Sequence, residues 1–510
     1  SAFTLPLMKL RWISFLFSIG FAPGMSLAQT RPAVSSARVI NLDTLPLLFV
    51  DDSGIAASSG VIRTVYAAKS HPTPVLEPKL PWEGSRVYVY GSVYFDEAAG
   101  VLSLWYLGHP EPDASGKEPR VPGFRKGKGD VVLYATSKDG LEWERPDLGL
   151  HSFHGSKANN IVFDLHSASV LHDLKEKDPA KRYKMLGSRV GAYYAAVSAD
   201  GLNWQRYPDD NPILTASDNI SLTQDPFTGE YLAYHRRPSP KNGRCVWLSR
   251  SADFHTWSKP ELVFAADAED NVWVRHPGER TEVNNLSVFP HAAGFLGLPN
   301  IFRVLVPTRP AEELAHGQSG TDGILEVQLI TSGDGTHWQR TRPRLPVIAR
   351  GAPGSFDAGA ILGVSSTCVH VGDETWVYYT ALTTSHGAPI PPKRNAIGLA
   401  EWRRHGFASL DAGENGRIET HPLRLRGMDL IINANAAGGE LRVALLEADG
   451  SAIAGFSLEE SEVLNKDAPR WKARWKRGSG KTTPELPDDR LVKVVVTMRQ
   501  ARLYSLSCVR

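Results

Sequence analysis

Four carboxylate side chains stand just ahead of segments that have the alternating pattern of β-strands. They are Glu83 in LPWEGSRVYVYG, Asp218 in ASDNISLTQD, Glu282 in RTEVNNLSVFP and Asp357 in GSFDAGAILG. A pair of carboxyl groups can supply a general acid together with a base or nucleophile, which is the chemistry of glycosidic-bond hydrolysis. Asp218 and Glu282 form the leading candidate pair, with Asp357 and Glu83 in support.

Cationic, polar and aromatic side chains could position the hydroxyl or carboxylate groups of a glycan, and an aromatic ring could stack on a sugar. The substrate-binding candidates are Asp52, Arg63, Trp82, Arg86, Asn160, His166, Arg236 and His386. No spacing of His, Cys and Asp predicts a transition-metal site. No cofactor is expected, and a structural calcium ion stays open although the sequence carries no signature for one.

A repeated turn indicates which elements must position these side chains. The skeleton Ser-x-Asp-Gly-x-x-Trp occurs at 137–143, 198–204 and 332–338, and a variant copy occurs at 251–257. Asp-Gly favours a tight turn, because glycine adopts positive φ at little cost and aspartate can bond the turn backbone. The aspartates of the repeat are therefore expected to be structural, and the tryptophans to occupy equivalent buried positions.

A second strand–turn–strand pattern precedes each copy, as in 92–108 and 221–236. Two hairpins make a four-stranded unit, and five such units predict a five-bladed β-propeller over residues 30–418. From 419 to 510 the repeat is absent and alternating strands predict a C-terminal antiparallel β-sandwich. Propeller sites lie in the central channel, where loops lead into the innermost strands. The four acids are expected there, close enough to repel one another, so that one keeps its proton near neutral pH.

The first residues indicate export. Lys9 and Arg11 precede the apolar run WISFLFSIGFAPGM, which is too short to span a bilayer, and Ser26-Leu27-Ala28 fits a cleavage site. Residues 1–29 are therefore expected to be a signal peptide with upstream residues. The mature chain is expected in the periplasm or outside the cell, with no membrane insertion.

The charge balance makes nucleic acid a poor candidate for the partner. The 510 residues include 57 Lys and Arg against 55 Asp and Glu, without a basic run. Three distant cysteines form no disulfide framework. A carbohydrate substrate is the expected partner.

The segments LFVDD, SKDGLEWERPDLGL, RYKMLGS and GLAEWRRHGFASLDAG resemble secreted bacterial proteins described as glycoside hydrolase family 32-like. The resemblance covers most of the chain from about residue 45. It implies a five-bladed propeller, a C-terminal β-sandwich and action on glycans. The chain lacks the Trp-x-Asn-Asp-Pro-Asn-Gly, Arg-Asp-Pro and Glu-Cys motifs of family 32 enzymes, so no catalytic residue is transferred by motif.

These features together predict a secreted glycoside hydrolase that acts on a poly- or oligosaccharide. Two alternatives stay open. A sialidase-like hydrolase would carry related turns, with one more residue between Asp and Gly. A non-catalytic glycan-binding propeller would keep aromatic side chains in the channel but would need no carboxylate pair.

Overall fold

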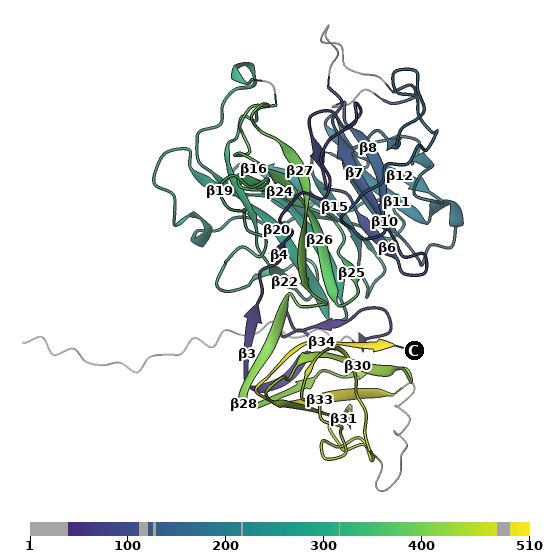
Figure 1. Cartoon of the computed structure of the whole chain (residues 1–510), viewed down its shortest axis with the longest axis vertical. Helices are drawn as coiled ribbons and strands as arrows, with labels where there is room; N and C mark the ends of the chain where they lie inside the picture. Colours follow the sequence, from purple (N-terminus) through teal and green to yellow (C-terminus); the bar gives the residue numbers. More distant parts are fainter. Residues whose placement is uncertain are drawn as a thin grey trace, which may run out of the picture. The chain divides into compact units, whose positions relative to one another are not determined.

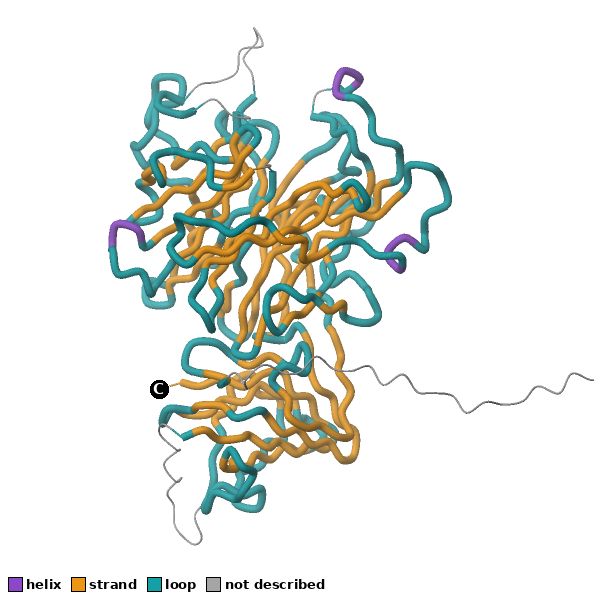
Figure 2. The backbone as a smooth tube through the Cα atoms, turned by 180° about the vertical axis from the view of Figure 1, so that it is seen from behind, coloured by secondary structure: helices purple, strands orange, loops and turns teal. Residues whose placement is uncertain are grey.

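The computed structural model of the chain describes residues 39–111, 121–125, 129–215, 218–315, 317–476 and 490–509. Within these ranges all regular structure is β, apart from the short 3₁₀ turns Pro179–Lys181, Glu269–Asn271 and Ala311–Glu313 (Figures 1 and 2). The all-β prediction is therefore confirmed. The expected signal peptide, residues 1–29, lies outside the described residues.

Five antiparallel sheets form the blades of a β-propeller. Blade 1 contains β5 (Val87–Tyr88), β6 (Val93–Asp96), β7 (Val101–Gly108), β8 (Val131–Ser137) and β9 (Ile161–Phe163). Blade 2 contains β10 (His166–His172), β11 (Tyr183–Arg189), β12 (Ala192–Ser198), β13 (Trp204–Tyr207) and β14 (Leu214–Thr215). Blade 3 contains β15 (Ile220–Gln224), β16 (Tyr231–Ser239), β17 (Gly243–Ser251) and β18 (Glu261–Phe264).

Blade 4 contains β19 (Arg280–His291), β20 (Gly294–Val304), β21 (Gly323–Val327), β22 (Ile330–Ser332) and β23 (Gln339–Arg340). Blade 5 contains β24 (Ala360–Val364), β25 (Val369–Val371), β26 (Glu374–Leu382), β27 (Asn395–Arg403) and β4 (Lys69–Ser70). Because β4 comes from the beginning of the described chain and pairs with β27, blade 5 joins both ends of the propeller and closes it.

Small polar side chains link the innermost strands of neighbouring blades. In order around the propeller, the bonds are Ser92 Oγ to Val170 O (2.6 Å), Leu222 N to Ser169 Oγ (3.0 Å), Asn219 Nδ2 to Asn284 O (3.5 Å), Ser287 Oγ to Val364 O (3.2 Å) and Ser366 Oγ with Ser92 Oγ (2.6 Å). Each bond satisfies a buried polar group and ties two blades together. The innermost strands therefore form a closed ring around the propeller axis.

The repeated turn fastens one blade to the next. Asp139 Oδ1 accepts from the backbone N–H groups of Leu141 and Glu142, each at 2.9 Å. The carbonyl of Gly140 in this turn accepts from the Tyr378 hydroxyl of blade 5 at 3.0 Å. The next copy repeats the arrangement, since Gly201 O accepts from Trp105 Nε1 of blade 1 at 2.8 Å. The motif is structural, as its turn chemistry predicts.

The tryptophans of the repeat pack into the blades to different degrees. Trp143 is buried, whereas Trp204, Trp257 and Trp338 are half-buried although each contacts a core cluster. Trp204 begins β13, the edge strand of blade 2, which pairs only with β12 among the described strands. Each tryptophan of the repeat contacts a core cluster, as predicted. The prediction that all four are buried is wrong for Trp204, Trp257 and Trp338.

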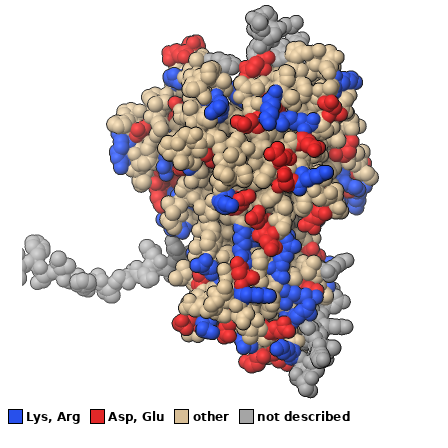
Figure 3. All heavy atoms as spheres, viewed as in Figure 1, with Lys and Arg blue, Asp and Glu red and all other residues tan. Residues whose placement is uncertain are grey.

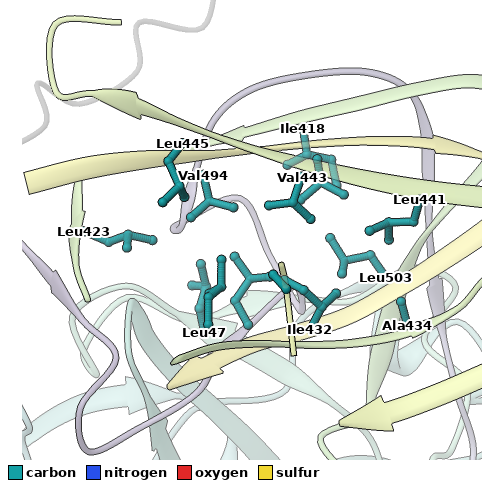
Figure 4. Packing of buried hydrophobic residues seen from close by; sticks show 14 of the residues in the cluster. Leu47, Ile418, Leu423, Ile432, Ala434, Leu441, Val443, Leu445, Val494 and Leu503 are labelled. Carbon is teal, nitrogen blue, oxygen red and sulfur yellow. The ribbon is translucent and has the colours of Figure 1, made fainter. Parts of the chain in front are cut away.

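The C-terminal part forms one ten-stranded sheet that makes the β-sandwich. Its strands are β1 (Ile40–Asn41), β2 (Leu47–Leu48), β3 (Ile55–Val65), β28 (Ala408–Thr420), β29 (Leu423–Arg424), β30 (Asp429–Asn435), β31 (Glu440–Glu447), β32 (Asp467–Lys472), β33 (Leu491–Arg499) and β34 (Ala501–Val509). Figure 4 shows Leu47 packed in one apolar core with Ile418, Val443 and Leu503.

The observed strand membership differs from the expected ranges. Strands β1 to β3 were expected within the propeller range 30–418, but β3 pairs with β28 and belongs to the sandwich. The expected boundary at 418–419 falls inside β28. The pattern of β3, IAASSGVIRTV, does not reveal its partner because that partner is far away in the sequence.

The surface carries both charges. On the face shown in Figure 3, Lys and Arg are interspersed with Asp and Glu, in line with the balanced composition. In the part of the chain that the structure describes, no helix has the length and apolar character that a membrane span requires.

Candidate active site

Ionisable side chains from four blades gather where the innermost strands begin. His166 is the first residue of β10, Asp218 precedes β15, and Glu282 is near the start of β19. Tyr90 of blade 1 follows β5, and its ring lies 6.5 Å from that of His166. We call Tyr90, His166, Asp218, Glu282 and the two arginines Arg236 and Arg244 the axial cluster.

Asp218 is held from two sides. His166 Nε2 lies 2.9 Å from Asp218 Oδ1, and Arg236 forms an ion pair with Oδ2. Arg236 also donates from Nη1 to Asn284 Oδ1 at 2.7 Å, which links Asp218 to the strand that carries Glu282. The side chain of Asp218 is 22% exposed, so solvent or a ligand can reach it.

A buried carboxylate behind His166 orients its ring. His166 Nδ1 lies 2.5 Å from Asp130 Oδ2, and His109 bonds the other oxygen of Asp130. Burial by itself would raise the pKa of Asp130, but the charge and hydrogen bonds of His166 and His109 outweigh it, so the pKa falls below its ordinary range. The ionised Asp130 therefore fixes the His166 ring with Nε2 toward Asp218, in the chain His109–Asp130–His166–Asp218.

Glu282 lies between two guanidinium groups. Arg280 Nε is 2.7 Å from Glu282 Oε1, and Arg244 Nη1 is 3.0 Å from Oε2. The glutamate side chain is only 4% exposed. Gly243 makes the close approach feasible, because a Cβ at this position would lie 2.4 Å from Oε1. The expected repulsion between bare carboxylates is therefore replaced by ion pairing, since Asp218 and Glu282 each have arginine partners.

The arginines stay charged despite their burial. Burial lowers the pKa of Arg236 to about 10, and the nearby charge of Arg244 acts in the same direction. The pKa of Arg244 is also lowered by burial, although Glu282 opposes the shift. Both groups therefore remain cationic near neutral pH and can hold carboxylates in place.

His386, a predicted substrate-binding residue, lies beside the axial cluster. Burial lowers its pKa to about 3, and the charge of Arg244 adds to the effect. The neutral ring has Nδ1 at 2.8 Å from Thr321 O, so this nitrogen donates and Nε2 is left as an acceptor. Its ring packs 5.0 Å from that of Phe302, over which the Arg244 guanidinium also lies.

Glu83 does not join the axial cluster. It is fully buried, and its oxygens accept from the Tyr106 hydroxyl and Arg145 Nε, both at 2.6 Å. They also accept from the backbone N–H groups of Lys79 (2.7 Å) and Leu80 (3.0 Å). Because the Glu83 carboxylate already accepts four hydrogen bonds, it stabilises the blade 1 loop and is not available to a substrate.

Two of the predicted binding residues belong to the same blade 1 network. Trp82 Nε1 donates to Asn160 Oδ1 at 2.6 Å, and Asn160 Nδ2 donates to the Tyr106 hydroxyl at 3.0 Å. Trp82 is therefore held by its polar end within the framework around Glu83. Trp82 and Asn160 therefore stabilise the loop around Glu83 and do not belong to the axial cluster.

Asp357 is also enclosed by its own blade. Its oxygens accept from Ser355 Oγ at 2.7 Å and from the Tyr379 hydroxyl at 2.9 Å, and the residue is 3% exposed. Tyr379 belongs to the core that includes strands of blades 4 and 5. Asp357 thus stabilises the approach to β24 and is not brought together with Asp218 and Glu282.

Asp52 and Arg63 lie with the sandwich. Arg63 is in β3, donates to Phe49 O at 2.9 Å and pairs with Asp52 at 2.5 Å. Asp52 is 75% exposed at its side chain. The two were expected near the channel because residues 30–65 were assigned to the propeller, and the pairing of β3 with β28 places them in the other sheet.

Sequence reasoning missed Tyr90 and Arg244 of the axial cluster, and it missed Asp130 and His109 behind His166. Asp130 leads into β8, the third strand of blade 1, and His109 follows β7. Neither precedes an innermost strand, so the rule that selected the other acids passes over them. Among the described residues, no group of three or more His, Cys, Asp or Glu side chains is arranged to hold a metal ion.

Comparison with known proteins finds likeness at the level of structure only. The chain matches no family model, and no curated protein matches its sequence. A solved structure described as a glycoside hydrolase is 12% identical with a TM-score of 0.43, covering 66% of this chain and 92% of its own. An N-acetylgalactosamine deacetylase from F. plautii is 16% identical, with a TM-score of 0.39 and coverages of 73% and 97%. A Bombyx mori GH32 β-fructofuranosidase is 11% identical, with a TM-score of 0.40 and coverages of 87% and 94%.

Proposed function

We propose that this protein is a secreted glycoside hydrolase that cleaves a poly- or oligosaccharide at the axial cluster. One observation carries the proposal. Asp218 and Glu282 come from neighbouring blades, and Arg236 links Asp218 to Asn284, which lies on the same strand as Glu282. Two positioned carboxyl groups are what hydrolysis of a glycosidic bond requires.

The partners of the two acids suggest different roles. His166 faces Asp218 and can bring a proton to it, so the Asp218–His166 pair takes the role of general acid. Arg244 and Arg280 stabilise the negative charge of Glu282, which then acts as the base or the nucleophile. Asp130 is a positioning residue, because it contacts His166 and holds the ring in the orientation that reaches Asp218.

Unsatisfied polar atoms support a carbohydrate ligand. The Oδ1 atoms of Asn285 and Asn395 are buried and have no hydrogen-bond partner among the described residues. The side chains of Asn285 and Tyr90 both lie next to Gly363, because a Cβ on this glycine would meet both of them. Sugar hydroxyl groups are donors that could satisfy such carbonyl oxygens.

A tyrosine nucleophile of the sialidase type has less support. Tyr90 is the tyrosine of the axial cluster, and burial raises its pKa well above the ordinary value, with Tyr88 adding to the effect. Forming the phenolate there would be costly, so the carboxylate Glu282 is the better nucleophile.

A panel of aryl glycosides and polysaccharides tests the proposal. Wild type should release product from at least one member, and Asp218→Asn should lower kcat by about 100-fold or more. The matched control is Asp225→Asn, because Asp225 accepts from Phe227 N at 2.8 Å in the β15–β16 hairpin and should leave kcat nearly unchanged. Binding without any cleavage would instead identify a glycan-binding propeller, and an active Asp218→Asn with a dead Asp225→Asn would refute the assignment.

A further inference from the structure

Two cationic side chains, Arg86 and Lys393, lie near each other where blades 1 and 5 meet. Arg86 directly precedes β5 of blade 1, and Lys393 comes just before β27 of blade 5, the strand that packs against β5. The Tyr88 hydroxyl is within hydrogen-bonding reach of Arg86 and of Asn395, the first residue of β27. Blades 1 and 5 therefore bring the two cations close enough for each charge to act on the other, with Arg86 beside Tyr88.

Within the described part of the chain, neither cation forms an ion pair with a carboxylate. Among the described residues, the ion pairs of the axial cluster join Arg236 to Asp218 and Arg244 to Glu282, but no ion pair includes Arg86 or Lys393. Lys393 Nζ donates to the carbonyl oxygens of Gly317 (2.7 Å) and His386 (2.9 Å). Arg86 Nε is buried and finds no hydrogen-bond partner among the residues that the structure describes. Donors and positive charge are therefore left for a ligand.

The local charge is only partly balanced. Burial lowers the pKa of Lys393 to about 8, and the charge of Arg86 contributes in the same direction. Asp322 opposes the shift, but its Oδ1 is occupied by the backbone N–H groups of Gly323 and Gly387, both at 2.7 Å. A mutually repelling pair of cations, with Lys393 buried and Arg86 half-buried, is an arrangement that a bound anion stabilises.

Aromatic rings connect this pair to the acids. The Tyr88 and Tyr90 rings are stacked with centroids 6.0 Å apart and an angle of 15°, and Tyr90 neighbours His166. His166 in turn contacts Asp218. A ligand group held by Arg86 and Lys393 would therefore sit two tyrosine rings away from the reacting bond.

We propose that the substrate carries an anionic group, a carboxylate or a sulfate ester, which binds between Arg86 and Lys393. The inference rests on the proposed hydrolase function, because it names the substrate class of the same site. Arg86 is suited to bidentate contact with two oxygens of such a group, and Lys393 supplies a point charge beside it.

Calorimetry with single sugars tests the anion site without requiring turnover. Glucuronate, galacturonate and galactose 6-sulfate are the probes, and galactose is the neutral reference. Wild type should bind at least one acidic sugar at least tenfold more tightly than galactose, and Arg86→Gln should remove this preference. Preference for the uronates or for the sulfate distinguishes the two sources of the anion.

The matched control is Arg394→Gln, which removes the same charge from an exposed position next to Lys393 and should keep the preference. Lys393→Gln should behave like Arg86→Gln, and raised chloride should weaken the acidic sugars only. Equal binding of acidic and neutral sugars by wild type, or an unchanged preference in Arg86→Gln, would overturn the inference.

Hydrolysis separates this inference from the proposed function. If acidic sugars bind through Arg86 while no glycoside is cleaved, the anion site holds and the hydrolase proposal fails. If neutral aryl glycosides are cleaved equally well by wild type and Arg86→Gln, and acidic ones no better, the hydrolase proposal holds and the anion site fails.

Discussion

Replacing His405 by Gln should reduce the amount by which the free energy of unfolding falls in acid. His405 and His370 are packed edge to face with ring centroids 4.5 Å apart. His405 Nδ1 lies 3.0 Å from Ser505 Oγ, and His370 Nδ1 lies 2.9 Å from Thr375 Oγ1. Glutamine can keep a hydrogen bond to the serine, but it cannot take up a proton.

The size of the effect follows from the two pKa values. Burial lowers the pKa of His405 to about 2, with the neighbouring His370 adding to the shift, and burial lowers that of His370 to about 3. In the unfolded chain both return to about 6.5, so the unfolded state binds more protons below this pH and stability falls as the pH falls. About pH 4.5 is two units below the pKa of the unfolded state. At this pH, each histidine lowers the free energy of unfolding by about 2.7 kcal/mol relative to neutral pH.

Urea unfolding followed by tryptophan fluorescence measures this loss. Between about pH 7 and about pH 4.5, His405→Gln should lose about 2–3 kcal/mol less than wild type does. His276→Gln, at an exposed position, is the control and should follow wild type. If His405→Gln loses as much stability in acid as wild type, the buried histidine pair does not govern the acid response and the reasoning fails.

Four further predictions can be checked separately. Gly201→Ala should destabilise by more than about 1 kcal/mol in thermal or urea unfolding, because its φ is +75° and a Cβ would lie 2.7 Å from the Trp105 ring. Tyr90→Phe should keep most of kcat; a loss of several orders of magnitude would favour a tyrosine nucleophile. Glu282→Gln should lower both turnover and stability, the latter by about 3 kcal/mol, because two guanidiniums lose their anion. Mass spectrometry of the exported protein should find an N-terminus near Gln29, and an intact Met8 start would contradict export.

The propeller could be predicted because its signal is local. In each turn the aspartate bonds backbone groups two and three residues later, so a seven-residue motif contains most of its own structural explanation. Because the turn recurs in successive blades, its contact with the neighbouring blade recurs as well, as between Gly201 and Trp105. By contrast, β3 has no local signal for its pairing with β28, and the boundary of the sandwich could not be read from it.

The candidate site could be predicted only in part, for the same reason. Glu83, Asp218, Glu282 and Asp357 occupy similar places in the sequence pattern, yet their partners come from other strands. Tyr106 and Arg145 enclose Glu83, and Tyr379 encloses Asp357, whereas Asp218 stays partly open. Such partners depend on tertiary packing, so the sequence alone could not separate Asp218 and Glu282, which join the axial cluster, from Glu83 and Asp357, which do not.

Azide rescue of Glu282→Ala tests most directly whether Glu282 acts at the reacting bond. The variant is assayed on an aryl glycoside with a good leaving group, after its folding has been checked by fluorescence. Azide can occupy the space of the lost carboxylate between Arg244 and Arg280 and attack the sugar carbon. The account predicts that azide raises turnover at least tenfold and yields a glycosyl azide of inverted configuration. Full activity of the folded variant without azide, or no response to azide, would contradict the assignment.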